Sequence, residues 1–144
     1  MEPRISIALH RLDNLIMRKM NQAAEAYVPG ISVIQGRIMG YVKRSRMKGK
    51  TVRQKDLEKE FGIARPTATL LLQAMEKNGY ISRIRDPEDG RHRIVTLTEK
   101  GDDVLCRSQV PFQEFEHTLA GMLTEEEKTE LLRILNKLLQ NMQE

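Results

Sequence analysis

Residues 54–101 read QKDLEKEFGIARPTATLLLQAMEKNGYISRIRDPEDGRHRIVTLTEKG, and they carry most of the information about the fold. Glycine stops helices, and proline suits the first turn of a helix. The stretch therefore predicts one short helix that ends at Gly62 and a second that begins near Pro66 and ends before Gly79. Two short helices joined by a turn that contains glycine are typical of a helix-turn-helix.

A β-hairpin is expected directly after these helices. The segments YISRIR at 80–85 and HRIVTLT at 92–98 alternate with a period of two and are rich in Ile, Val and Thr. The segment between them, DPEDGR at 86–91, is dense in turn-forming residues. The sequence therefore predicts a wing behind the helix-turn-helix.

Threonines mark three predicted helix starts. Thr51 with Gln54, and Thr124 with Glu127, have the spacing of a capping box. Thr98 is placed to cap the helix that follows the wing. We therefore expect helices to begin just after these three threonines.

Long amphipathic helices flank the central region. Apolar residues recur at three- and four-residue steps from Ile5 until Pro29 ends the pattern. Pro111 predicts a kink in the helix after the wing, and leucines from Leu131 onward approach the a/d spacing of a coiled coil. These leucines pack either within one subunit or against a second copy. We favour the second copy, because a chain of this size has little else to cover two long apolar helices.

Composition excludes several classes of protein. The 144 residues include a single cysteine, Cys106, and no Cys/His cluster with metal-ligand spacing, so we expect no disulfide, metal or cofactor. Cys106 is expected to be a small buried hydrophobe. Mean hydropathy is −0.50 and the N-terminal stretch carries charges, which argues against a membrane span and a signal peptide and favours the cytoplasm. No glycine-rich phosphate loop or nucleophile elbow is visible, so an enzyme is the least favoured class.

Charge is segregated along the chain. The segment 37–100 holds 16 basic and 8 acidic residues, whereas the remaining ends hold 8 basic and 12 acidic ones. A basic middle between acidic ends is typical of a polyanion-binding module on a scaffold with another role. An ordinary solvated charged surface is the alternative that composition alone leaves open.

The segment 89–101 resembles the wing signature of the multiple antibiotic resistance regulator (MarR) family, D-x-R-x-x-x-V-x-L-T-x-x-G. Its fixed positions are matched by Asp89, Arg91, Val95, Leu97, Thr98 and Gly101. Residues 54–83 are similar to the helix-turn-helix of the same family. The resemblance is close over 51–101, and the number of helices on either side fits as well.

The resemblance implies a mainly α fold with a small β-hairpin wing, a winged helix-turn-helix with N- and C-terminal dimerisation helices. The DNA-binding domain would span 31–101, and the dimerisation region would comprise 1–30 and 102–144. The family further implies a homodimer that binds double-stranded DNA, and release by a small-molecule effector such as a phenolic compound. A two-fold dimer implies a pseudo-palindromic operator with half-sites roughly 10 bp apart.

Two departures from the family concern helix caps. Ala64 stands where the family usually has a serine cap for its recognition helix, and its side chain accepts no hydrogen bond; such a change typically costs ~1 kcal/mol. Arg53 stands where many members carry Thr or Ser, which is why we assign the cap of the preceding helix to Thr51.

Most of the candidate DNA contacts fall into three groups. Outward-facing residues of the second short helix are candidate base readers, because Arg pairs with guanine, Gln with adenine, and Thr offers hydroxyl or methyl contacts. In the family the D-x-R arginine enters the minor groove and the aspartate braces it; this aspartate equally fits a turn cap, and one carboxylate can serve both roles. Further basic residues are candidate phosphate contacts. The full set is Arg65, Pro66, Thr67, Thr69, Gln73, Arg53, Gln54, Arg83, Arg85, Asp89, Arg91 and Arg93.

The sequence therefore favours a sequence-specific transcriptional regulator, and a repressor over an activator because the bound protein would occlude a promoter. The alternative is a winged-helix module for protein interaction or for non-specific nucleic-acid binding. A tip arginine in the D-x-R element favours the first, since a protein-binding wing has no need of one.

Overall fold

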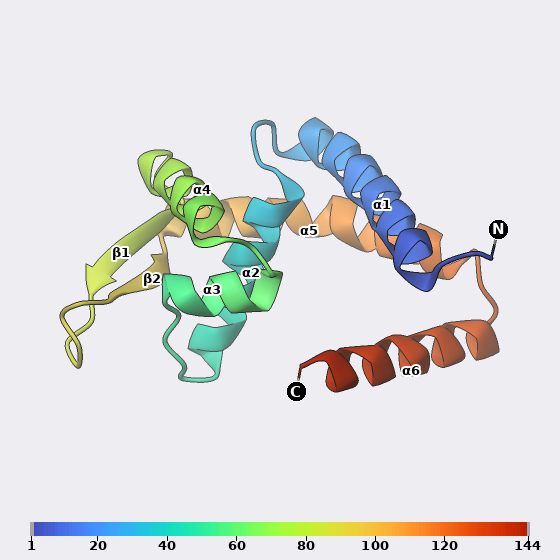
Figure 1. Cartoon of the computed structure of the whole chain (residues 1–144). Coiled ribbons are helices and arrows are strands. Elements are labelled where there is room, and N and C mark those ends of the chain that lie inside the picture. Colours follow the sequence, from blue (N-terminus) through green and yellow to red (C-terminus); the bar gives the residue numbers. More distant parts are fainter. Residues whose placement is uncertain (1, 144) are drawn as a thin grey trace. The chain divides into compact units, whose positions relative to one another are not determined.

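The computed structural model describes residues 2–143, and these form helices and one β-hairpin in the predicted order (Figure 1). The mainly α fold with a small wing is confirmed. The elements are α1 (Ile5–Tyr27), α2 (Val33–Met47), α3 (Gln54–Phe61), α4 (Arg65–Lys77), β1 (Ile81–Arg85), β2 (Arg93–Leu97), α5 (Glu99–Ala120) and α6 (Glu125–Met142).

The chain divides into two compact units between Gln109 and Val110, inside α5. The first unit contains the hydrophobic core, to which every element from α2 to the start of α5 contributes. Its most deeply buried side chains include Met39 of α2, Leu57 of α3 and Met75 of α4, all with 0% exposure. Val95 of β2 and Val104 of α5 close the same core. The helix-turn-helix and the wing are thus held by one core.

The two strands of the hairpin are antiparallel, and a third, shorter extended segment lies beside them. Ile81 lies opposite Leu97, and Arg85 lies opposite Arg93. The segment before α3 runs along the other edge of β2, where the N–H of Val95 donates to the carbonyl of Val52 over 2.7 Å. The root of the wing is therefore fixed to the chain that leads into α3.

Thr98 joins the end of α4 to the start of α5. Its N–H donates to the carbonyl of Tyr80 over 3.1 Å, and its hydroxyl donates to that of Gly79 over 2.6 Å. The same hydroxyl accepts the N–H of Gly101 over 3.0 Å, which is the cap expected for this helix. Gly101 comes so close to Tyr80 that a Cβ would lie 2.0 Å from its carbonyl oxygen. Only glycine fits there.

The other predicted caps have mixed outcomes. Thr124 and Glu127 form the expected capping box at the start of α6. The cap assigned to Thr51 is wrong, because α3 begins at Gln54 and its N-cap is Arg53. The physical reason is that residues 52 and 53 extend along β2 and cannot also adopt helical angles. Arg53 makes no side-chain cap, and its own N–H donates to the carboxylate of Asp56 over 2.9 Å.

The outer helices expose much apolar surface. In α1, Met20 is the one buried residue, and Ile5 and Leu12 are 70% and 48% exposed. In the second unit, Leu132 and Leu139 of α6 are 51% and 56% exposed. Among residues 2–143, no helix is both long and apolar enough to span a membrane.

The expectation that Cys106 is buried is wrong. Its neighbours Val104 and Leu105 face the core of the first unit, whereas Cys106 is exposed. Successive residues of a helix are turned by about 100°, so the residue that follows two core positions points away from the core.

We predict that Gly101→Ala destabilises the protein by roughly 3 kcal/mol, because the methyl group cannot fit against Tyr80 unless the backbone shifts. Gly36→Ala in α2 is the matched control: a Cβ there meets nothing within 4 Å. It should raise stability by up to about 1 kcal/mol through helix propensity. Urea unfolding measures both, and equal stability of the two variants would contradict the packing at Gly101.

Candidate nucleic-acid interface

The second helix of the helix-turn-helix, α4, is positioned by its sequence at both ends. Gly62 ends α3 in the left-handed conformation with φ of 60°, and the N-cap of α4 is Ala64, which makes no side-chain hydrogen bond. Pro66 lies in the first turn, as expected. On the inner face, Ala68 and Leu72 are each 1% exposed, which fixes the opposite face toward solvent.

That outward face presents most of the predicted base readers. Arg65, Pro66, Thr67 and Gln73 are exposed, and Thr69 is half-buried. The side chains therefore offer a guanidinium, an amide and hydroxyl groups along one side of a helix. Contact of these residues with DNA stays a prediction.

Gln54 is tied to this helix. Its side-chain amide donates a 2.9 Å hydrogen bond to the hydroxyl of Thr69. Because Gln54 is the first residue of α3, the bond links the start of α3 to the middle of the outward face of α4. The structure thus gives Gln54 an internal partner that the sequence did not indicate.

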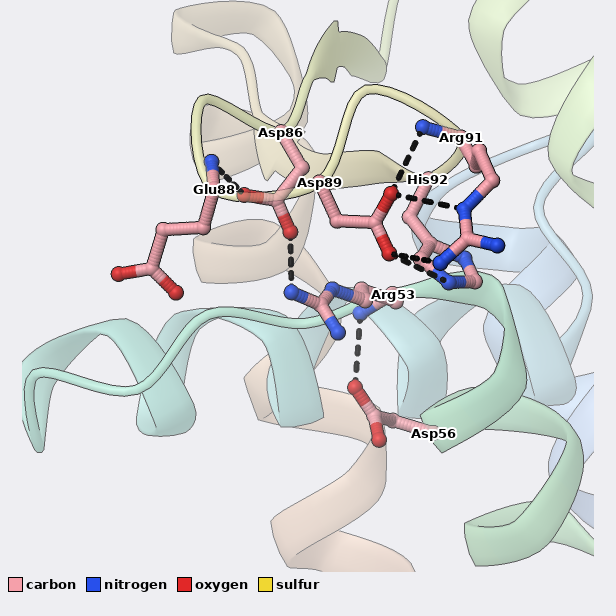
Figure 2. Close-up of polar contacts among 7 residues, drawn as sticks. All are labelled: Arg53, Asp56, Asp86, Glu88, Asp89, Arg91 and His92. Atoms are coloured by element: carbon pink, nitrogen blue, oxygen red, sulfur yellow. Dashed lines mark hydrogen bonds and ion pairs between the residues drawn. The ribbon is translucent and has the colours of Figure 1, made fainter.

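The wing tip carries a braced arginine (Figure 2). The carboxylate of Asp89 accepts hydrogen bonds from the Nε and Nη2 of Arg91 over 3.1 and 3.2 Å, and from its backbone N–H over 3.1 Å. Asp89 therefore both braces the side chain and caps the turn. The side chain of Arg91 is still 87% exposed. Hydrogen bonds from the Arg91 side chain, with those from its backbone, lower the pKa of Asp89 below its ordinary value.

The other arginines of the hairpin differ in their surroundings. Arg83 is 18% exposed and its Nε lies 3.0 Å from a carboxylate oxygen of Glu76 on α4, so it joins the wing to the recognition helix. Arg85 and Arg93 are exposed on the facing strands. The side chains of Arg85 and Arg93 are therefore accessible to a DNA phosphate.

Arg53 is placed at the root of the wing, where it pairs with Asp86 (Figure 2). Asp86 was considered in the sequence only as a turn former, yet it is 4% exposed and is the one buried charged side chain among the described residues. The backbone N–H of Glu88 and the guanidinium of Arg53 lower its pKa, although burial opposes them. An aspartate directly after a strand, two residues before its hydrogen-bond donor, was the available signal.

A cavity of about 350 Å³ lies away from these residues, where α2, the end of β2 and the start of α5 meet. Its lining includes Val42 and Leu97, and the Lys43–Asp102 ion pair. Within residues 2–143, no group of three or more His, Cys, Asp or Glu side chains is arranged to hold a metal ion.

We predict that Arg91→Ala raises the pKa of Asp89 back toward 3.8, because the largest cause of its lowering is the hydrogen bond from that side chain. Because the pKa of Asp89 is lower in the folded than in the unfolded protein, Asp89 stabilises the wing at pH values above its unfolded-state pKa. This stabilisation is lost as the pH falls through the folded-state pKa. Carboxyl-carbon NMR titration measures the shift. Arg107→Ala, which removes a partner of Asp103 on α5, is the control and should leave it unchanged.

Comparison with known proteins places this geometry among regulators. Residues 46–92 match the family model described as "MarR family". A transcriptional activatory protein of Rhodopseudomonas palustris, BadR, is 27% identical over 141 residues, which cover 96% of this chain and 78% of BadR. YdgJ of Bacillus subtilis, an uncharacterised HTH-type regulator, is 30% identical over 90 residues, which cover 62% of this chain and only 55% of YdgJ.

The whole fold has solved counterparts. MepR of S. aureus, in a crystal structure of its DNA complex, matches with a TM-score of 0.84 and 28% identity, over 97% of this chain and 99% of MepR. The match therefore includes the outer helices as well as the central region. The helix-turn-helix and the start of the wing therefore match the MarR family, and the chain shares with MepR the architecture of a winged helix-turn-helix regulator.

Proposed function

We propose that this chain is a homodimeric transcriptional regulator that binds a pseudo-palindromic operator in double-stranded DNA, and that it acts as a repressor. The observation that carries the proposal is the joint exposure of the α4 face and of the braced Arg91 at the wing tip. Both belong to a fold matched over its full length by MepR, which was crystallised with DNA. A regulator of this kind meets its operator in the cytoplasm, and the proposal assigns it no catalytic activity.

The two elements would read the operator in different ways. On α4, Arg65 supplies two donors suited to guanine in the major groove, and Gln73 supplies one donor and one acceptor suited to adenine. Arg91 suits a narrow A·T-rich minor groove, where negative potential is concentrated. Exposed Arg85 and Arg93 supply phosphate contacts, which add affinity and register without sequence information. Release by a small-molecule effector, as the family resemblance implies, stays a prediction.

Selection of bound duplexes from a random pool, followed by titration at two salt concentrations, separates this proposal from its alternative. Enrichment of one pseudo-palindrome with A·T-rich flanks under the wings supports a regulator. Binding to all sequences with a steep salt dependence supports a non-specific nucleic-acid module, and absence of binding supports a protein-interaction module.

We predict that Arg65→Ala and Arg91→Ala each weaken operator binding by roughly 10-fold or more, since one good contact to a base is worth about 1–3 kcal/mol. Fluorescence anisotropy with the selected operator measures the affinities. Arg107→Ala, an exposed arginine on α5 with a carboxylate partner, is the matched control and should bind as the wild type does. Unchanged affinity in both test variants would refute the assignment of these elements.

We predict that the protein sediments as a dimer at micromolar concentration. Leu132 and Leu139 lie seven residues apart on one exposed face of α6, so replacing both by Asp should shift the equilibrium to monomer. Lys137→Asp, on the opposite side of the same helix, is the control and should leave the dimer intact. A wild-type protein found only as monomer would contradict the proposed assembly.

A further inference from the structure

The loop of the wing is organised around the buried carboxylate of Asp86 (Figure 2). One of its oxygens accepts the backbone N–H of Glu88 over 2.9 Å, and the other accepts Nη2 of Arg53. The backbone N–H of Asp86 donates to the carbonyl of His92 over 3.0 Å. Asp86 therefore holds both ends of the loop that lies between the two strands.

The same loop carries the wing-tip arginine. The N–H of His92 donates to the carbonyl of Asp89 over 3.0 Å, and Asp89 in turn holds Arg91. A continuous set of contacts thus runs from Asp86 through the loop to the guanidinium of Arg91. Displacement of Asp86 would change the direction in which that guanidinium leaves the wing.

Arg53 brings this loop into contact with a different element. It is the N-cap of α3, and it forms an isolated β-bridge with Ile94 of β2. Its Nε is buried without a hydrogen-bond partner among the described residues. An unpaired buried donor is unfavourable, so the pairing of the same guanidinium with Asp86 is what offsets its burial there.

Two consecutive residues therefore link α3 to both proposed DNA-reading elements. Arg53 contacts the wing through Asp86, and Gln54 contacts the outward face of α4 through Thr69. The start of α3 therefore contacts both elements, and together with the Arg83–Glu76 pair it holds the wing at its distance from the recognition helix.

We propose that Arg53 and Asp86 are positioning residues for DNA recognition, which hold the wing-tip Arg91 at the spacing from α4 that the minor groove requires. The inference rests on the proposed function and deepens it. It gives Arg53 an internal role in addition to, or in place of, a phosphate contact. Its distinguishing consequence is that Asp86 acts on DNA affinity only through Arg91.

A double-mutant cycle tests this dependence, with Asp86→Asn and Arg91→Ala measured singly and together by anisotropy on the selected operator. Asp86→Asn alone should weaken binding by about 10-fold, a typical coupling for residues in one network. In the Arg91→Ala background it should cause little further loss. Asp103→Asn is the matched control, since it also removes a carboxylate from an ion pair but lies on α5 and is exposed. It should not change affinity.

A purely structural role for Asp86 predicts a different result. Equal fold-losses with and without Arg91 would overturn the proposal, and so would unchanged affinity of Asp86→Asn. Arg53→Lys, which keeps the charge but not the planar fork, should reproduce the cycle and replaces Asp86→Asn if that variant does not fold. Wild-type protein that selects no operator would instead refute the proposed function.

Hydrogen exchange, measured without DNA, distinguishes a local effect on the wing loop from a general loss of stability. Asp86→Asn should speed exchange of the Glu88 and His92 amides, which lie in the loop, and leave the α4 amides unchanged. Faster exchange throughout α4 as well would indicate a general loss of stability and would count against a positioning role.

Discussion

The hydroxyl of Thr98 holds together the three elements on which the interface depends. It donates to the carbonyl of Gly79 at the end of α4 and accepts the N–H of Gly101 at the start of α5, while the backbone of Thr98 closes the hairpin against Tyr80. A hydroxyl is needed because one atom must both donate and accept. Glycine is needed beside it because the backbone of Tyr80 leaves no room for a side chain. The root of the wing is thereby fixed relative to the helix-turn-helix.

Local pattern was sufficient to predict most of the architecture. The hairpin follows from period-two alternation and a dense turn, and the limits of α4 follow from Pro66 and Gly79, all of which act within a few residues. The caps at Thr98 and Thr124 are local for the same reason. The prediction that Thr51 caps α3 was wrong because a long-range contact outweighs the local capping-box spacing. The pairing of Val52 with Val95 holds the chain extended until Gln54.

The candidate interface could be predicted as a set of residues, but among its contacts only the one between Asp89 and Arg91 was expected. Composition and the D-x-R element indicated that Arg53, Arg83 and Arg91 were all candidates for DNA. Their partners, however, come from segments up to 33 residues away, as in the Arg53–Asp86 pair. Sequence periodicity carries no information on such pairs. The structure divides the arginines into those used within the protein and those still exposed.

Helix α6 lies entirely within the described residues and has no buried side chain. This affects the stability of the protein in the cell. A helix with no core of its own gains stability from association, so in the proposed dimer the folding equilibrium includes the protein concentration. Thermal midpoints would then rise with concentration, and a chain diluted below its dissociation constant would lose the order of α6 before that of its core. Cellular abundance would therefore determine both how much regulator is present and how much of each molecule is folded.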